Sequence, residues 1–263
     1  MTTYPLWEGK APGAATEVPA IDAYIPEKKT TTAAILILPG GAYTGRAPHE
    51  GPAFAEYFNT LGIAGFVLTY RVSPATFPDP LLDARRAMRY LRANAERFGI
   101  DPDRIAVIGS SAGGHLAALL STYGEPIEGE GADALDALPY LPNAQILCYP
   151  VISSDEAVSH AYSYHRLLGD RYEERAAFSP ELLVTEGTPR AFIWHTAEDA
   201  CVNVQNSYRY ATALREHNVS CEMHIFPYGA HGLGLSPKDA HVAQWCGLLV
   251  AWLKLSGFLP AEA

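Results

Sequence analysis

The sequence has few cysteines, and they are too far apart to indicate a metal site or a disulfide framework. The four are Cys148, Cys201, Cys221 and Cys246, and no two of them form a Cys-x-x-Cys pair. A zinc site or a disulfide-rich secreted domain would need close, regular spacings. We therefore expect no metal ion and no cofactor, and we interpret Cys148 and Cys221 as buried thiols in apolar runs.

The sequence also lacks a long apolar run and an excess of positive charge. No apolar stretch approaches the length of about 20 residues that crosses a bilayer, and residues 1–16 lack the basic start and apolar run of a signal peptide. The 19 basic and 29 acidic side chains give a formal net charge of −10. Such a charge disfavours phosphate backbones and anionic membranes as partners. We expect a cytoplasmic protein that binds neither nucleic acid nor membrane, acts on a small molecule, and is either a monomer or a homo-oligomer.

What the sequence does contain is a regular alternation of apolar runs with amphipathic segments over its 263 residues. Apolar runs without internal alternation are typical of strands covered on both faces, and helical segments between them indicate β-α-β units. The predicted strands are 33–38, 63–70, the run before Gly109, 144–149, 191–195 and 221–226; the predicted helices are 51–61, 81–98, the segment after Ser111, 204–218 and 239–255. The prediction is one α/β domain, 1–263, with a doubly wound, mostly parallel sheet flanked by helices.

Several segments do not fit this alternation. Residues 4–26 read as irregular chain or an edge strand, because prolines interrupt them. Residues 151–189 contain no strand-like run and are long for a crossover, so they predict a small lid-like insertion. The arginines spaced along 81–98 are interpreted as a solvated helix face, and 123–142 as a polar, acidic loop.

The stretch Gly109-Ser110-Ser111-Ala112-Gly113 joins a predicted buried strand to an Ala/Leu-rich predicted helix. This is the context of a Gly-x-Ser-x-Gly nucleophile, in which a serine stands on a tight strand-to-helix turn. Only Ser111 has glycine both two residues before and two residues after it. We therefore predict Ser111 as a nucleophile.

A serine hydroxyl needs a histidine base and an acid that orients the histidine, and on this topology both follow the serine in the chain. Asp199 and Glu198 follow the 191–195 strand, and His231 follows the 221–226 strand between Gly229 and Gly232. Asp199 is favoured over Glu198 because a short carboxylate before a helix accepts backbone hydrogen bonds. The other histidines are interpreted as packing groups (His195 and His224) or as a brace of the helix after Ser111 (His115).

A tetrahedral intermediate also needs backbone donors for its oxyanion, each worth about 3 kcal/mol. One predicted donor is the N–H of Ala112. The others are predicted in the loop after the 33–38 strand, at Gly40, Gly41 and Ala42. A plain turn remains the alternative for this Gly-Gly pair.

The runs LPGGAY, APHEG, LTYRVSP, DPDRIAVIGSSAGGHLA, FIWHTAEDACV and FPYGAHGLGL resemble the α/β-hydrolase superfamily, and within it the small esterases grouped with acetyl xylan and feruloyl/acetyl esterases. The resemblance implies Ser111, Asp199 and His231 as catalytic residues and Gly41, Ala42 and Ala112 as the oxyanion hole. Ala42 departs from relatives that often have a third glycine there. The implied substrate-binding residues are Tyr43, His49 and Glu50, with helix capping as the alternative for His49 and Glu50.

The expected function is a serine esterase that removes short acyl groups, acetyl first, from acylated sugars or xylo-oligosaccharides. The alternatives are an amidase, such as an aryl-formamidase, or a small peptidase on the same fold. A non-catalytic binding protein of this fold is a further alternative, although the sequence retains all three triad residues.

Overall fold

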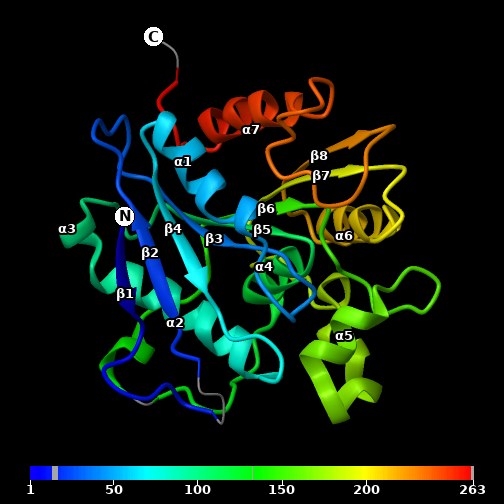
Figure 1. The fold of residues 1–263 in the computed structure, drawn as a ribbon, viewed down its shortest axis with the longest axis horizontal. Coiled ribbons are helices and arrows are strands. Elements are labelled where there is room, and N and C mark those ends of the chain that lie inside the picture. The colour runs from blue at the N-terminus through cyan, green and yellow to red at the C-terminus, as the bar shows by residue number, and fades with distance from the viewer. Residues whose placement is uncertain (14–16, 132, 262–263) are drawn as a thin grey trace.

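The computed structural model describes residues 1–13, 17–131 and 133–261. Its centre is an eight-stranded sheet in the order β1-β2-β4-β3-β5-β6-β7-β8 (Figure 1). The strands are β1 (Thr2–Pro5), β2 (Ala20–Tyr24), β3 (Ala34–Leu38), β4 (Ala64–Thr69), β5 (Ile105–Ser110), β6 (Ala144–Cys148), β7 (Ala191–Thr196) and β8 (Cys221–Phe226). From β4 to β8 all neighbours pair in parallel. The predicted mostly parallel, doubly wound sheet is therefore confirmed.

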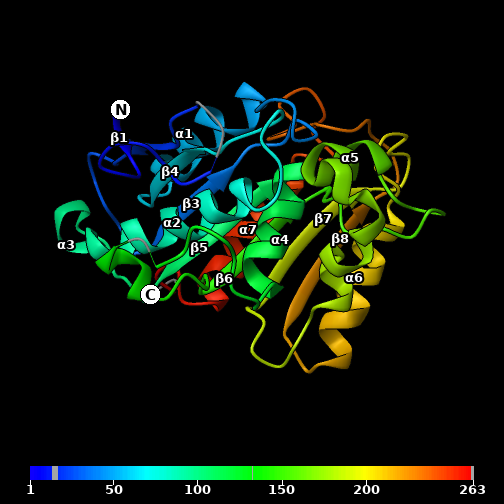
Figure 2. The same ribbon diagram turned by 90° about the horizontal axis from the view of Figure 1, so that it is seen from below.

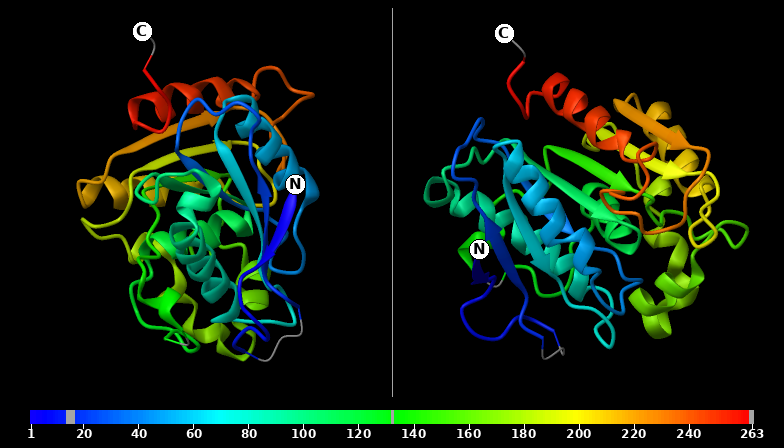
Figure 3. Two further views of the ribbon diagram at one scale, coloured as in Figure 1. Left: turned by 90° about the vertical axis from the view of Figure 1, so that its left-hand side faces the viewer. Right: turned by 45° about the horizontal axis from the view of Figure 1, so that its top comes forward.

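Helices cover both faces of the sheet, so the central strands are buried on both sides. One face packs against α1 (Pro52–Thr60) and α7 (Gln244–Leu255); the other packs against α2 (Asp79–Ala93), α3 (Ala95–Phe98), α4 (Ala112–Thr122) and α6 (Gln205–Glu216). In the left view of Figure 3, α7 (red) lies on one side of the sheet and the green helices lie on the other. This double cover explains why β3, β5 and β6 are buried at every position.

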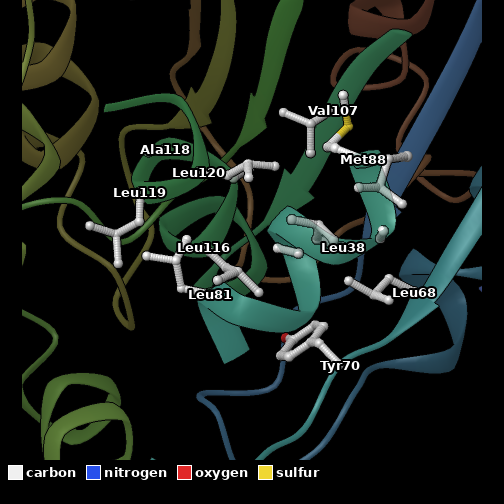
Figure 4. Packing of buried hydrophobic residues seen from close by; sticks show 14 of the residues in the cluster. Leu38, Leu68, Tyr70, Leu81, Met88, Val107, Leu116, Ala118, Leu119 and Leu120 are labelled. Atoms are coloured by element: carbon white, nitrogen blue, oxygen red, sulfur yellow. The ribbon is translucent and has the colours of Figure 1, made fainter. Parts of the chain in front are cut away.

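The packing beside β5 holds the strand and the helix that flank Ser111. Figure 4 shows Leu116, Leu119 and Leu120 of α4 and Leu81 and Met88 of α2, which belong to one cluster with side chains from β3, β4 and β5. Each of these five side chains is fully buried. Because interiors of this density resist displacement, the end of β5 is a rigid support for the turn that follows it.

The N-terminal segment forms two strands where the sequence predicts irregular chain or one edge strand. β1 pairs antiparallel with β2, and β2 pairs antiparallel with β4. Elsewhere the predicted helices are present with two differences: the helix predicted over 81–98 is divided at Asn94 into α2 and α3, and α7 begins at Gln244, five residues later than predicted.

The prediction of a solvated arginine face was wrong for Arg85, Arg86 and Arg89 of α2, although Arg97 of α3 is exposed. Arg85, Arg86 and Arg89 are only 1%, 3% and 6% exposed. The acidic loop after α4 folds over them: Glu130 contacts Arg85 at 2.7 Å and Arg89 at 2.8 Å, and Asp133 accepts a hydrogen bond from Arg86 at 2.6 Å. Glu130 and Asp133 of this loop are therefore paired with arginines of α2.

The segment between β6 and β7 carries α5 (Ala161–Leu168) and two 3-10 helices, η3 (Gly169–Phe178) and η4 (Pro180–Leu182). In Figure 2, α5 lies near the ends of β7 and β8. Two further 3-10 helices are η1 (Pro48–Glu50) and η2 (Ala134–Ala137). In the described ranges, no helix combines the length and the apolar character needed to cross a membrane.

Candidate active site

Ser111 sits on a strained turn between β5 and α4. Its φ of 54° and ψ of −119° lie outside the regions that non-glycine residues ordinarily occupy. The turn is so tight that a Cβ added to Gly113 would overlap the carbonyl oxygen of Leu38. Ser110, the neighbouring serine, is fully buried within the strand, whereas Ser111 is 7% exposed. The turn therefore presents Ser111 and conceals Ser110.

A chain of two hydrogen bonds links Ser111 to an acid through a histidine. The Oγ of Ser111 lies 2.8 Å from Nε2 of His231, and Nδ1 of His231 lies 2.6 Å from Oδ2 of Asp199. His231 is in the loop after β8, and Asp199 is in the loop after β7. Parallel strands bring these loops to one edge of the sheet. Glu198, the alternative acid, is exposed.

Asp199 is held by more than its histidine partner. Its Oδ1 accepts hydrogen bonds from the backbone N–H groups of Cys201 (2.9 Å) and Val202 (2.8 Å). Burial alone raises the pKa of Asp199, but the hydrogen bonds from His195, His231 and the Val202 N–H outweigh it and hold the pKa well below its ordinary value. The carboxylate is therefore charged at neutral pH.

His195 has a contact with the site that the sequence analysis missed. The ring is fully buried. Its Nε2 lies 3.1 Å from Oδ2 of Asp199 and 3.0 Å from the carbonyl oxygen of Val202, and its Nδ1 lies 2.8 Å from Oγ of Ser207. Since both partners of Nε2 are acceptors, Nε2 carries the proton and Nδ1 accepts from Ser207. In the sequence, the sign of this contact is that His195 lies four residues before Asp199, at the end of a strand.

The loop after β3 has backbone N–H groups suited to an anion. Gly41, Ala42 and Tyr43 follow one another at φ values of 140°, 52° and 58°. Within the described part of the chain, no group accepts a hydrogen bond from the N–H of Gly41, Ala42 or Ala112. The N–H of Gly40 is not free, because it donates to Oε2 of Glu50 at 2.8 Å. The loop after β3 and the first residue of α4 thus each have free backbone donors, and Gly40 packs this loop against Ser111, where a Cβ on Gly40 would lie 3.0 Å from the Cβ of Ser111.

The three residues that the resemblance implies for substrate binding occupy different positions. Tyr43 is 1% exposed and its hydroxyl lies 2.8 Å from Nδ1 of His115. Glu50 is 3% exposed. The side chain of His49 is 56% exposed, and its Nε2 lies 2.8 Å from the carbonyl oxygen of Gly232. The structure thus leaves His49 as the accessible member of the set and places Tyr43 and Glu50 beneath the surface.

His115 and the insertion adjoin the site. Nε2 of His115 donates to the carbonyl oxygen of Phe178 in η3 at 2.9 Å, so His115 joins α4 to the insertion as well as to Tyr43. His160, just before α5, lies 3.6 Å from Sγ of Cys201. Among the described residues there is no group of three or more His, Cys, Asp or Glu side chains that could hold a metal ion.

An open hollow of about 710 Å³ borders the histidine. It is lined by His231 with residues of its own loop and of the Asp199 loop: Glu198, Ala200, Cys201, Gly229 and Ala230. A larger hollow of about 1030 Å³ lies elsewhere, beside Tyr123 and Tyr140. Of these two hollows, the one of 710 Å³ borders His231, and the other is lined by none of Ser111, His231 and Asp199.

Comparison with known proteins places the chain in a family. The model of the family described as BD-FAE matches residues 21–214. The chain belongs to the BD-FAE family. The matched region of this BD-FAE chain begins in β2 and ends in α6, so it includes Ser111 and Asp199 but stops before His231.

A solved structure is similar to this BD-FAE chain over nearly its whole length. The acetyl ester-xyloside bifunctional hydrolase from Caldicellulosiruptor lactoaceticus is 40% identical, with a TM-score of 0.92 over 98% of this chain and 97% of that one. The acetylxylan esterase of Xylanibacter ruminicola is 32% identical over 88% of this chain, and endo-1,4-beta-xylanase B of Butyrivibrio fibrisolvens is 35% identical over 88%. The matches span only 47% and 37% of those two relatives. The α/β-hydrolase fold expected from the sequence is confirmed.

Proposed function

We propose that this protein is a serine ester hydrolase that removes short acyl groups, acetyl foremost, from acylated sugars or xylo-oligosaccharides. The observation that carries the proposal is the continuous chain of hydrogen bonds from Ser111 through His231 to the buried Asp199. A serine on a strained turn, a histidine that can take its proton and a charged carboxylate that orients the histidine are the parts that acyl transfer to serine needs.

The geometry supports the following sequence of steps. Ser111 Oγ attacks the ester carbonyl while Nε2 of His231 takes its proton, and the N–H groups of Gly41, Ala42 and Ala112 stabilise the oxyanion. The C–O bond to the alcohol then breaks, and His231 gives its proton to the leaving oxygen. A water molecule attacks the acyl-enzyme with His231 again as base, which releases the carboxylic acid and restores Ser111.

The identity of the alcohol is supported by the surroundings of the histidine. Because His231 protonates the leaving oxygen, the alcohol must lie next to Nε2 of His231. The 710 Å³ hollow is lined by His231 and therefore offers space for the alcohol. An open hollow at this place suits a bulky, hydrated alcohol such as a sugar. The names of two relatives, an acetylxylan esterase and an acetyl ester-xyloside hydrolase, support acetylated xylan as the source of that alcohol.

We also propose that residues 151–189 act as a short lid beside the active site of a single-domain enzyme. The contacts of Phe178 with His115 and of His160 with Cys201 support this assignment, because they attach the insertion to the site at two points. A lid of this size argues against long acyl chains. The cytoplasmic location stays a prediction.

The test compares p-nitrophenyl acetate, butyrate and decanoate, and then acetylated xylo-oligosaccharides and formyl-kynurenine. The expected order is acetate, butyrate, decanoate, with acetate released from the xylo-oligosaccharides. A preference for decanoate would contradict the short-acyl proposal, and faster turnover of formyl-kynurenine would favour an amidase. Ser111→Ala is expected to abolish turnover with an unchanged circular dichroism spectrum; retained turnover would exclude Ser111 as the nucleophile.

A further inference from the structure

A buried carboxylate lies beneath the site with no cation in hydrogen-bond contact among the described residues. Oε2 of Glu50 accepts from the backbone N–H of Gly40 at 2.8 Å, and Oε1 accepts from the hydroxyl of Tyr149 at 2.6 Å. Nε2 of His49 is 3.7 Å from Oε1, too far for a hydrogen bond, and contacts the carbonyl oxygen of Gly232 instead. Burying a carboxyl group is costly unless its oxygens are hydrogen-bonded, and both oxygens of Glu50 are bonded to groups that adjoin the site.

The first partner, Gly40, connects Glu50 to the nucleophile and to the oxyanion loop. A Cβ added to Gly40 would lie 2.7 Å from Oε2 of Glu50 and 3.0 Å from Cβ of Ser111. The chain at Gly40 is therefore packed between the carboxylate and the nucleophile. The positive-φ run that begins at Gly41 follows directly, and a strained loop keeps its conformation only where its surroundings hold it. The hydrogen bond to Glu50 fixes the peptide from which this run starts.

The second partner, Tyr149, connects Glu50 to the histidine loop. Tyr149 is 2% exposed, and its hydroxyl accepts a hydrogen bond from the N–H of Gly234 at 3.0 Å. Its ring packs edge-on against the imidazole of His231, with centroids 5.1 Å apart. Burial, together with the charge of Glu50, raises the pKa of Tyr149 well above its ordinary value, so the phenol keeps the proton it donates.

We propose that Glu50 is a positioning residue that holds two parts of the catalytic machinery at once. Through Gly40 it fixes the loop of the oxyanion donors, and through Tyr149 it fixes the loop of His231. Glu50 would therefore act on the transition state without touching the substrate. The inference rests on the proposed function, because it assigns a role to Glu50 in stabilising the oxyanion of acyl transfer.

The test measures kcat and KM of Glu50→Ala, Glu50→Gln and Tyr149→Phe on p-nitrophenyl acetate, with Glu56→Gln, an exposed site on α1, as the matched control. Glu50→Ala is expected to lower kcat about 100-fold and to leave KM within about threefold, because loss of an oxyanion donor acts on the transition state. Glu50→Gln is expected to lose only about tenfold, since its amide oxygen still accepts from Gly40. Tyr149→Phe keeps that bond too and is expected to show a similar loss.

A transition-state mimic separates positioning from general damage to the fold. The affinity for a trifluoromethyl ketone, which forms a tetrahedral adduct with a serine, should fall by the same factor as kcat/KM in each variant. The double variant of Glu50 and Tyr149 should lose less than the product of the single losses, because the two side chains act as one unit. If Glu50→Ala does not fold, Glu50→Gln and Tyr149→Phe decide by the same measurements.

Two results would overturn the inference. One is a folded Glu50→Ala and a folded Tyr149→Phe whose kcat stays within threefold of the unsubstituted protein. The other is a rise in KM alone, which would indicate direct binding of substrate by Glu50. Ser111→Ala, measured in parallel, distinguishes failure of the inference from failure of the proposed function: an active Ser111→Ala refutes the latter, whereas an inactive one leaves the Glu50 variants to be judged by themselves.

Discussion

The substitution Asp199→Asn should stop turnover without removing any of the bulk of the side chain. Asp199 accepts four hydrogen bonds: two backbone N–H groups at Oδ1, and His231 and His195 at Oδ2. An asparagine has only one acceptor oxygen. If that oxygen keeps the two backbone donors, its NH2 group faces the two histidine nitrogens. If the amide turns round, the NH2 group faces the backbone donors instead.

The consequence for catalysis follows from the first arrangement. With an NH2 group opposite Nδ1, His231 is stabilised with its proton on Nε2, and Nε2 can then no longer take the proton of Ser111. For a wrong tautomer of this kind kcat falls about 10⁴-fold. Each lost hydrogen bond to the buried charge costs about 1.5–3 kcal/mol. Since the two histidine bonds are lost, we expect the free energy of unfolding to fall by about 3–6 kcal/mol.

The assay is steady-state hydrolysis of p-nitrophenyl acetate together with urea unfolding. Asp103→Asn is the matched control, because the side chain of Asp103 is 91% exposed and remote from the site. Glu198→Gln tests the alternative acid and should lose less than tenfold. An Asp199→Asn protein with kcat within tenfold of the unsubstituted protein would refute the reasoning. A larger loss in Glu198→Gln than in Asp199→Asn would assign the orienting role to Glu198.

Three further predictions concern the surroundings of the site. His195→Phe leaves Asp199 one hydrogen bond short and should lower the free energy of unfolding by about 2–4 kcal/mol and kcat about tenfold, whereas an unchanged kcat in a folded variant would show that His195 only packs. Burial lowers the pKa of His115 from 6.5 to about 4. The protein with neutral His115 is therefore fully stable above pH 6.5, and about 3 kcal/mol of the free energy of unfolding is lost as the pH falls towards 4. In urea unfolding measured at several pH values, His115→Phe should lack this part of the loss. A loss of stability with falling pH as large as in the unsubstituted protein would contradict the prediction. Glu130→Gln should lower the free energy of unfolding by about 1–3 kcal/mol, because it removes the negative charge that pairs with Arg85 and Arg89. Glu128→Gln, at an exposed position, should change the free energy of unfolding little in the same experiment.

The residues that lie at strand ends could be predicted from the sequence, because the ends of apolar runs are visible in it. Ser111 was marked by its two glycines and by the change from strand to helix. Asp199 and His231 were marked by their places after the next strands. In each case a local pattern decides the position, and the parallel sheet brings the loops together. The fold class follows from the same alternation of strands and helices.

The residues that hold the site could not be predicted in the same way, because their partners are distant in the sequence. His195 read as a packing residue in a strand, and only the structure shows its ring between Ser207 and Asp199. The arginines of α2 read as a solvated face, because a pattern within one helix does not show that an acidic loop 40–50 residues later covers it. A strand or helix pattern reports which face is polar but not what lies against it.

The loop after β3 shows this limit most clearly. Glycine is the ordinary sequence sign of a positive φ, yet Ala42 and Tyr43 also adopt it, at 52° and 58°. Their own side chains do not favour that conformation, so the energy that maintains it must come from contacts elsewhere. The bond from Gly40 to Glu50 and that from Tyr43 to His115 are two such contacts, one at each end of the strained run. A site whose donors depend on remote partners in this way can lose activity through residues that never meet the substrate.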